Sequence, residues 1–295
     1  MSIFLIVERT GGGSPAYFRL ETMNAASTGR WALWLSFPLA LLLAISSVPG
    51  IFLPSVVYAN ENRLYTSGAV GADLVNLVVV APLLMVTAIL ALRGWMGARL
   101  LWTSTVLYVV YAFIYYTLDV RFNHLFWAYC AVQGLSFYVL VGALPSLSIP
   151  EIARRYSSRT PAVATAILFL IIAAGAAIHW VQETGPAVLS GAAPQDIRES
   201  GHLTDVPAVL DIAFVLPALT IAAVLLLRRR PLGFVLGPVL LAFTGLLALL
   251  IMSIPAVLAW HGHGTGYGAF VNSGVVAAAA AVLLPLSLRS GANET

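Results

Sequence analysis

The sequence predicts an all-α fold, a polytopic transmembrane helical bundle of about eight spans. Of its 295 residues, 60% are hydrophobic and only 9% are charged, whereas soluble domains carry about 25% charged residues. The mean hydropathy is +0.93, and apolar runs long enough to cross a hydrocarbon core recur along the chain. This composition excludes a soluble domain and a disordered chain. The single cysteine, Cys130, excludes an internal disulfide scaffold.

Eight apolar segments are predicted to span the membrane as helices, because lipid offers no partner for unpaired backbone groups. Charges, glycine or proline bound each of them, as Arg93-Gly94 does after the second segment. The predicted spans are about 31–53, 73–92, 100–118, 125–147, 161–181, 207–227, 234–258 and 269–288. They form one transmembrane domain, 31–288, between an N-terminal segment, 1–30, and a tail, 289–295.

The arginines predict the orientation of these spans. All 15 basic residues are arginines, and eight spans place 12 of them on the side that holds both termini. The other side receives only Arg63, Arg121 and Arg198. Because positive residues concentrate in cytoplasmic loops, we predict a multi-pass protein of the cytoplasmic membrane with both termini in the cytoplasm. The absence of lysine excludes a Schiff-base pigment.

The first residues of the chain leave two questions open. Residues 1–22 contain only a short apolar run, and Met23 precedes a more natural beginning, so we predict Met23 as the true start. Val57-Tyr58-Ala59 is similar to a signal-peptidase site, but the apolar run before it is longer than the core of a signal peptide. An uncleaved first span is therefore expected.

An internal repeat of four plus four parallel spans is possible. Pro82 precedes Arg93 by eleven residues, and Pro217 precedes Arg228 by the same interval. In this register Asn76 corresponds to Asp211. Substrate paths of repeated transporters lie near the interface of the repeats. The alternative is a chance recurrence of proline and arginine in apolar helices.

Polar side chains collect in the outer halves of several predicted spans. Tyr108, Tyr111, Tyr115 and Asp119 share one face of the third span, because they are spaced by three or four residues. Ionisable groups at membrane depth are costly and tend to face a bundle interior or water, which predicts an outward-facing polar vestibule. Its candidate groups for a ligand or proton are Asp211, Asp73, Asn76, Asp119, Tyr115 and Gln133.

Each of these groups also has a structural interpretation. Asp73 and Asp205 suit the first position of a helix, where an aspartate caps the backbone. Asp119 is close enough in sequence to pair with Arg121. The tyrosines on the third span suit interhelical packing. Asp211 is the hardest to explain structurally, because it lies inside its span and has no adjacent cation.

All five histidines map to the outer side, and some have the spacing of metal ligands. His261-Gly262-His263 and the His202–Asp205 stretch offer nitrogen and oxygen ligands that suit zinc or copper, and a histidine also suits haem iron. The candidate metal ligands are therefore His261, His263, His202 and Asp205. Solvated histidines in a glycine-rich loop are the alternative, since no closed ligand set accompanies them.

One resemblance adds to these patterns. The stretch from Asp73 through Arg93 and Arg99 to Phe122-Asn123-His124-Leu125-Phe126 resembles a group of bacterial multispan membrane proteins. It covers about a fifth of the chain. The resemblance implies a bacterial polytopic membrane protein and no catalytic residue, since no activity is assigned to the group.

These observations favour a small transporter or permease-like carrier. In one form of this hypothesis, transport is coupled to protons. A membrane metalloprotein or enzyme, and a non-catalytic subunit or sensor, are the two alternatives. The expected partners are the lipid bilayer, a small polar ligand, a proton or metal ion, and a membrane-protein partner or second copy. Nucleic acid is not expected, and neither a phosphate-binding loop nor a catalytic triad motif is present.

Overall fold

The computed structural model describes residues 29–156, 161–262 and 266–288, and its regular structure there is helical. The segment with Met23 and the C-terminal tail lie outside the described residues. Eight helices are long and apolar enough to cross a membrane, which confirms the predicted class and number. They are Arg30–Phe52, Arg63–Leu92, Met96–Leu118, Phe126–Ser146, Ala162–Ser190, Val206–Leu227, Pro231–Trp260 and Tyr267–Leu288.

The first four spans form what we call the N-half. Several of its spans contain more than one helical segment, and short helices connect or follow them. Its elements are α2 (Arg30–Phe52), α3 (Pro54–Val57), α4 (Arg63–Val75), η1 (Asn76–Val80), α5 (Ala81–Leu92), α6 (Met96–Leu118), α7 (Phe126–Ala143) and η2 (Leu144–Ser146). The helix α8 (Ile149–Tyr156) leads out of the N-half.

The last four spans form the C-half. Its elements are α9 (Ala162–Ser190), α10 (Gln195–Ser200), α11 (Val206–Leu210), η3 (Asp211–Val215), α12 (Leu216–Leu227), α13 (Pro231–Trp260) and α14 (Tyr267–Leu288). The helix α13 lies against α4 and α6 and so joins the two halves. It is also the most buried of the eight spans.

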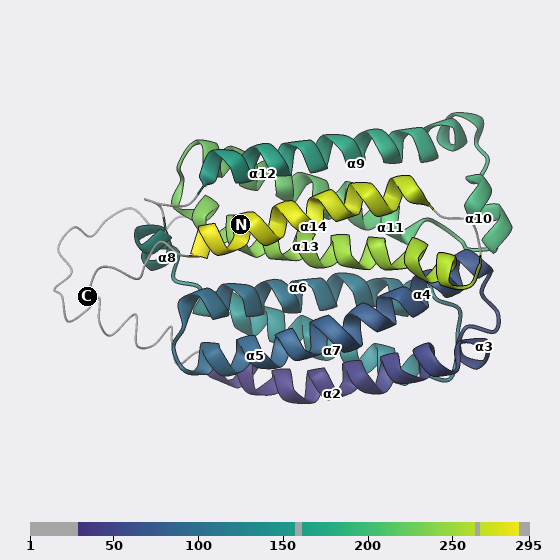
Figure 1. Cartoon of the computed structure of the whole chain (residues 1–295), viewed down its shortest axis with the longest axis horizontal. Coiled ribbons are helices and arrows are strands. Elements are labelled where there is room, and N and C mark those ends of the chain that lie inside the picture. Colours follow the sequence, from purple (N-terminus) through teal and green to yellow (C-terminus); the bar gives the residue numbers. More distant parts are fainter. Residues whose placement is uncertain (1–28, 157–160, 263–265, 289–295) are drawn as a thin grey trace, which may run out of the picture.

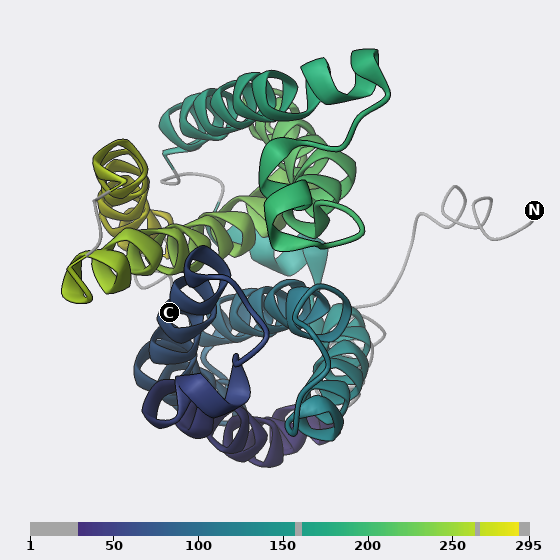
Figure 2. The ribbon, with the colours of Figure 1, turned by 90° about the vertical axis from the view of Figure 1, so that its right-hand side faces the viewer.

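The spans of the N-half form a closed ring, whereas those of the C-half do not. In the N-half, α2 packs against α5 and α7, and α6 packs against the same two helices, so that the four spans form a ring (Figure 2). In the C-half, α9 packs on α12, α12 on α13 and α13 on α14, but α9 and α14 share few contacts. The C-half is therefore more open than the ring beside it.

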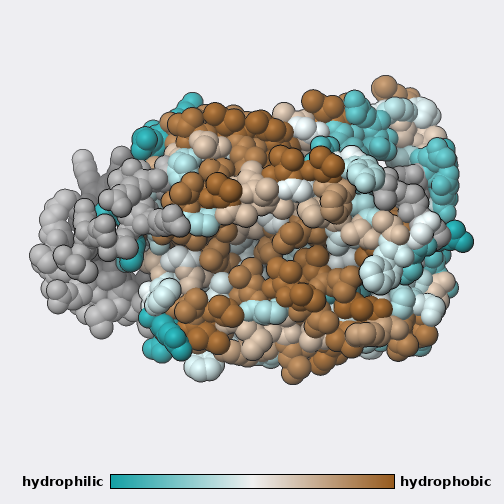
Figure 3. Space-filling model, in the orientation of Figure 1, coloured by the Kyte–Doolittle hydropathy of each residue, from teal (hydrophilic) through white to brown (hydrophobic). Residues whose placement is uncertain are grey.

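The bundle has two ends of different character, lying at opposite ends of the long axis in Figure 1. The arginine end carries Arg93, Arg99, Arg228 and the helix α8. The histidine end carries α3, α10 and the residues Glu61, His202 and His261. Hydrophobic residues dominate the middle of the face seen in Figure 3, and hydrophilic ones gather toward its ends. This distribution is what a bilayer requires of a spanning bundle.

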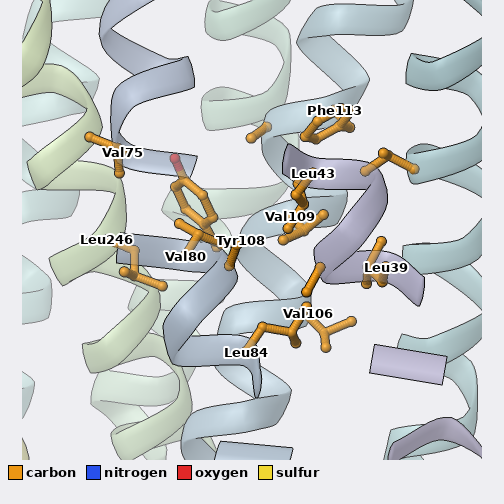
Figure 4. Packing of buried hydrophobic residues seen from close by; sticks show 14 of the residues in the cluster. Leu39, Leu43, Val75, Val80, Leu84, Val106, Tyr108, Val109, Phe113 and Leu246 are labelled. Atoms are coloured by element: carbon orange, nitrogen blue, oxygen red, sulfur yellow. The ribbon is translucent and has the colours of Figure 1, made fainter. Parts of the chain in front are cut away.

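Each half has its own apolar core. In the N-half, leucine and valine side chains from α2, α5 and α6 pack around the ring of Tyr108, which is fully buried (Figure 4). In the C-half, Phe169 packs among leucines and alanines of α12 and α13. The N-half core nevertheless contains fully buried polar side chains, which single out its interior as a place to look for function.

Two spans are interrupted by a π-helical turn in the same register. The π-helix η1 begins at Asn76 and is followed by Pro82, whereas η3 begins at Asp211 and is followed by Pro217. In each turn the first carbonyl accepts the N–H of the residue five positions later. The next residue is proline, which has no N–H, so the second carbonyl of each turn lacks its helical donor.

The second and fifth spans extend furthest beyond their predicted limits. The second begins at Arg63, ten residues before the predicted start, because Asn62 Oδ1 accepts the Tyr65 N–H at 2.9 Å and caps it there. The fifth continues through Pro186 to Gly191, whose φ of 69° ends the helix. Asp73 therefore lies inside a helix, so the interpretation of Asp73 as a helix cap is wrong.

Candidate functional site

The buried carboxylate of Asp73 is the centre of a cluster inside the N-half ring. Asp73 is 1% exposed. Its Oδ2 accepts the Tyr58 hydroxyl at 2.6 Å, and its Oδ1 accepts the Tyr116 hydroxyl at 2.9 Å. Desolvation raises the pKa of Tyr58, which lies outside the spans, far above its usual value, so this residue stays a neutral donor. The cluster therefore holds one carboxylate between two hydroxyl groups.

A glycine on α2 makes room for this carboxylate. A Cβ placed on Gly50 would lie 1.8 Å from Asp73 Oδ2 and 2.8 Å from the Tyr58 hydroxyl. The backbone of α2 therefore approaches the cluster more closely than any other residue type would allow. Ser47, one turn earlier on α2, also lies next to the Asp73 carboxyl group.

Several polar atoms of the N-half are buried without a hydrogen-bond partner among the described residues. These atoms are Ser47 Oγ, both amide atoms of Asn76, Ser104 Oγ and the Tyr108 hydroxyl, on residues that are all 0% exposed. Native proteins rarely leave such groups unsatisfied, so their presence together points to a bound species.

A second carboxylate, that of Asp211, lies where the C-half meets α6. Asp211 Oδ1 accepts the Tyr111 hydroxyl at 2.9 Å, and Oδ2 accepts Trp180 Nε1–H at 3.0 Å. The side chain is half-buried. Within the described residues neither Asp73 nor Asp211 takes part in an ion pair. Both carboxylates are thus held by neutral donors inside spanning helices.

The helix α6 contributes a tyrosine to each of these carboxylates. Tyr111 contacts Asp211, and Tyr116 contacts Asp73. The five-residue separation turns their side chains about 140° apart around the helix axis. The two carboxylates therefore lie on different sides of one helix and form separate sites.

The histidine end contains a third cluster, centred on His202. Its Nδ1 lies 2.7 Å from Asp119 Oδ1, and its Nε2 lies 3.2 Å from Glu61 Oε2. Glu61 also accepts the Arg121 N–H at 2.7 Å, and the Arg121 guanidinium donates to the Ser200 carbonyl. The expected pairing of Asp119 with Arg121 is wrong, because the neighbouring loop supplies His202 to Asp119. This cluster ties the loop before α11 to two loops of the N-half.

Burial changes the ionisation of Asp119 in this cluster. Desolvation raises the pKa of its carboxyl group above 3.8, and the hydrogen bond from His202 opposes part of that rise. The ring of Tyr65 packs on the other side of His202, with centroids 4.1 Å apart. His202 is therefore enclosed by Glu61, Asp119 and an aromatic ring, and the side chains of His202, Glu61 and Asp119 are each 3% exposed.

The predicted metal ligands that the structure describes have separate structural partners. Asp205 Oδ1 accepts the Ala208 N–H at 2.9 Å and caps α11, which confirms its structural interpretation. His261 Nδ1 lies 2.9 Å from the Val257 carbonyl, at the end of α13, and His263 lies outside the described residues. Among the described residues, no group of three His, Cys, Asp or Glu side chains is arranged to hold a metal ion.

The remaining candidates lie apart from the carboxylates. Tyr115 stacks on Tyr65 with centroids 6.4 Å apart, so it packs near the His202 cluster. Gln133 lies on α7 with its Oε1 buried and unpartnered among the described residues. Cys130, also on α7, is exposed. The predicted acids Asp73, Asp211 and Asp119 thus lie in three separate clusters.

Sequence reasoning did not identify four of the groups that build these sites. Tyr58 and Glu61 lie in the connection between the first two spans, Trp180 near the end of α9, and Tyr116 one residue beyond the predicted tyrosine stripe. The position of Trp180 next to His179 in an otherwise apolar run is the only local sign of a role. Tyr58 and Glu61 become neighbours of the acids through the fold alone.

Comparison with known proteins identifies no family for this chain. No family model, no curated protein and no solved structure matches it. The chain is a multispan helical membrane protein with eight candidate spans.

Proposed function

We propose that this protein is a small carrier that moves a polar solute across the membrane, with Asp211 as its principal solute- or proton-binding group. The histidine end is the outward face in this proposal, following the distribution of arginines, and the membrane is the cytoplasmic membrane. The observation that carries the proposal is the half-buried carboxylate of Asp211 inside a spanning helix, where Tyr111 and Trp180 bind it and no described cation pairs with it.

The chemistry of this carboxylate supports a transport role. A negative charge at membrane depth is costly, so such residues usually mark the pathways of ions, protons or substrates. A half-buried position leaves Asp211 accessible to a solute or proton. The two aromatic side chains orient the carboxylate without neutralising it.

The matched interruptions of the second and sixth spans also support a carrier. Transporters commonly place their binding groups at discontinuous helices in corresponding positions of two repeats. Here the π-helices begin at Asn76 and Asp211 and precede Pro82 and Pro217. The ends of these spans agree as well, since Gly94 and Arg229, which follow their last turns, both have positive φ. These likenesses support the proposed repeat of four plus four spans.

Reconstituted protein provides the test. Liposomes holding the full chain and the trapped pH indicator pyranine are exposed in turn to amino acids, monosaccharides, carboxylates and organic ammonium ions. We expect at least one class to change the internal pH, and Asp211→Asn to abolish that change. Asp205→Asn is the matched control, because asparagine also caps a helix and Asp205 serves as a cap.

Two results would overturn the proposal. The first is that no class of solute changes the internal pH and none accumulates as a radiolabelled solute in the same liposomes. The second is that the flux persists in Asp211→Asn at the level of Asp205→Asn. Thermal unfolding of each variant shows whether a lost flux reflects a lost fold.

A further inference from the structure

The interior of the N-half ring holds a carboxylate and several polar groups that the proposed carrier site at Asp211 does not use. Asp73 is 1% exposed, and Ser47 and Asn76 are both 0% exposed. Ser47 Oγ and both amide atoms of Asn76 have no hydrogen-bond partner among the described residues. A carboxylate and unsatisfied amide and hydroxyl oxygens at one level of a spanning bundle need a common explanation.

These groups lie on two facing helical segments. Asn76 follows Asp73 by three residues, which places the two side chains on the same face of their span. The helix α2 contacts both α4 and η1, and on α2 Gly50 abuts the Asp73 carboxylate and Ser47 lies beside it. Asp73, Asn76 and Ser47 therefore surround one region between α2 and the start of η1.

The backbone supplies a further acceptor next to Asn76. The Ala81 N–H donates to the Asn76 carbonyl, and Pro82 has no N–H to offer. The carbonyl of Leu77 thus loses the donor that a regular α-helix would give it. Freed carbonyls at interrupted helices are typical ligands of the coupling ions of transporters.

The donor set selects the class of ligand. It consists of oxygen atoms from a carboxylate, an amide, a hydroxyl and a carbonyl, which suit a hard cation rather than zinc or copper. The site has one negative charge. A monovalent cation neutralises it, whereas a divalent cation would leave a net positive charge inside the membrane, where uncompensated charge is costly. A proton would neutralise Asp73 but would leave the amide oxygen of Asn76 without a partner.

We propose that Asp73, Asn76 and Ser47 form a binding site for a monovalent metal cation, of the size and hardness of sodium, inside the N-half ring. Tyr58 and Tyr116 hold the carboxylate from the other side and fix its orientation. The site lies on a different side of α6 from Asp211. Its role as the site of a coupling ion rests on the proposed carrier function, but the binding itself does not.

Direct binding of radioactive sodium to the purified full chain in detergent tests this proposal. We expect saturable binding of ²²Na⁺ that unlabelled sodium displaces and choline does not. Asp73→Asn, which keeps the shape of the side chain, should abolish the binding. Ser47→Ala and Asn76→Ala should each weaken it by about tenfold or more, the scale of losing a group that supports a metal site.

Neighbouring residues provide matched controls. Ser46 precedes Ser47 on α2 and is 1% exposed, but its hydroxyl donates to the Leu43 carbonyl at 2.9 Å. Ser46→Ala should therefore leave sodium binding unchanged. Asp211→Asn should also leave it unchanged, because that carboxylate lies on another side of α6. A rise of the unfolding temperature in sodium chloride relative to choline chloride, lost only in the Asp73, Asn76 and Ser47 variants, is the second readout.

Three results would overturn the cation site. They are no displaceable sodium binding by the folded wild type, unchanged binding in Asp73→Asn, and stabilisation that depends on pH alone at constant sodium, which would indicate a proton instead. Each of these leaves the solute-driven flux of the carrier test unaffected. Conversely, a wild-type protein that binds sodium but shows no solute-driven flux would overturn the carrier and retain the cation site.

Discussion

The imidazole ring of His202 bridges two carboxylates from different connections of the N-half, Asp119 through Nδ1 at 2.7 Å and Glu61 through Nε2 at 3.2 Å. All three side chains are 3% exposed. We expect His202→Ala to lower the free energy of unfolding by about 1–3 kcal/mol, the cost of leaving a buried hydrogen-bonding group without its partner. Thermal and denaturant unfolding in detergent measure the change.

The control for this prediction removes the two carboxylates that His202 contacts. In the background Glu61→Gln/Asp119→Asn, His202→Ala should cost much less than it does alone, because no buried carboxylate then loses its partner. Equal costs in the two backgrounds would show that the ring contributes by packing on Tyr65 and not by bridging the carboxylates.

The raised pKa of Asp119 predicts a pH dependence of stability. Desolvation raises the pKa of the folded carboxyl group above its ordinary value of 3.8, so the folded chain holds this proton more tightly than the unfolded chain. Its contribution to stability is therefore fully present below about pH 3.8 and is lost as the pH rises through the raised value. Asp119→Asn lacks this titration.

The measurement compares unfolding temperatures of wild type and Asp119→Asn over a range of pH. We expect the wild type to lose stability relative to the variant as the pH rises above 3.8, until the folded carboxyl group has ionised. A wild type that gains stability relative to Asp119→Asn over the same range would contradict the prediction, since it would mean that His202 outweighs desolvation.

The close approach of α2 to Asp73 makes Gly50 a sensitive position. A Cβ there would meet Asp73 Oδ2 at 1.8 Å and the Tyr58 hydroxyl at 2.8 Å, so Gly50→Ala must displace the carboxylate cluster. We expect a loss of about 1–3 kcal/mol, as for other overpacked interiors. Gly134→Ala in α7 is the control, because nothing lies within 4 Å of its Cβ and alanine favours a helix by about 0.5–1 kcal/mol. Equal stability of the two variants would argue against the packing of Gly50 on Asp73.

A buried hydrogen bond near the arginine end offers a test of helix packing. Trp102 Nε1–H donates to Ser36 Oγ at 2.7 Å between α6 and α2, and both residues are 0% exposed. A double-mutant cycle of Trp102→Phe and Ser36→Ala should give a coupling of about 0.6 kcal/mol, and at most about 1.7 kcal/mol, the values known for hydrogen bonds between membrane helices. A coupling near zero would mean that the hydrogen bond contributes nothing to the contact between these helices.

Hydropathy was sufficient to predict the eight spans, because a bilayer imposes their length and composition. It failed at the start of the second span, where residues 66–72 are small and weakly apolar and a side-chain cap at Asn62 decides the boundary. The role of Tyr58, in the connection between the first two spans, was also not evident from its local sequence. Its sequence context is similar to a cleavage site, yet the residue is 2% exposed and bonds to Asp73.

The acids of the sites were visible in the sequence, but their partners were not. Asp73, Asp119 and Asp211 stand out because charge is rare in apolar spans. Their partners come from elsewhere in the chain, as His202 does for Asp119, 83 residues away, and Trp180 does for Asp211. Periodicity places residues on one helix face, whereas such pairings depend on how the helices are arranged around each other. The spacing of Asn76 and Asp211 from their prolines was visible too, but the π-helical turns required coordinates.

The position of Tyr111 and Tyr116 on one helix has a mechanical consequence. Because both tyrosines belong to one uninterrupted helix, Met96–Leu118, a rotation of α6 about its axis would move the two hydroxyl groups at once, each relative to a different carboxylate. Such a rotation would change both hydrogen bonds together.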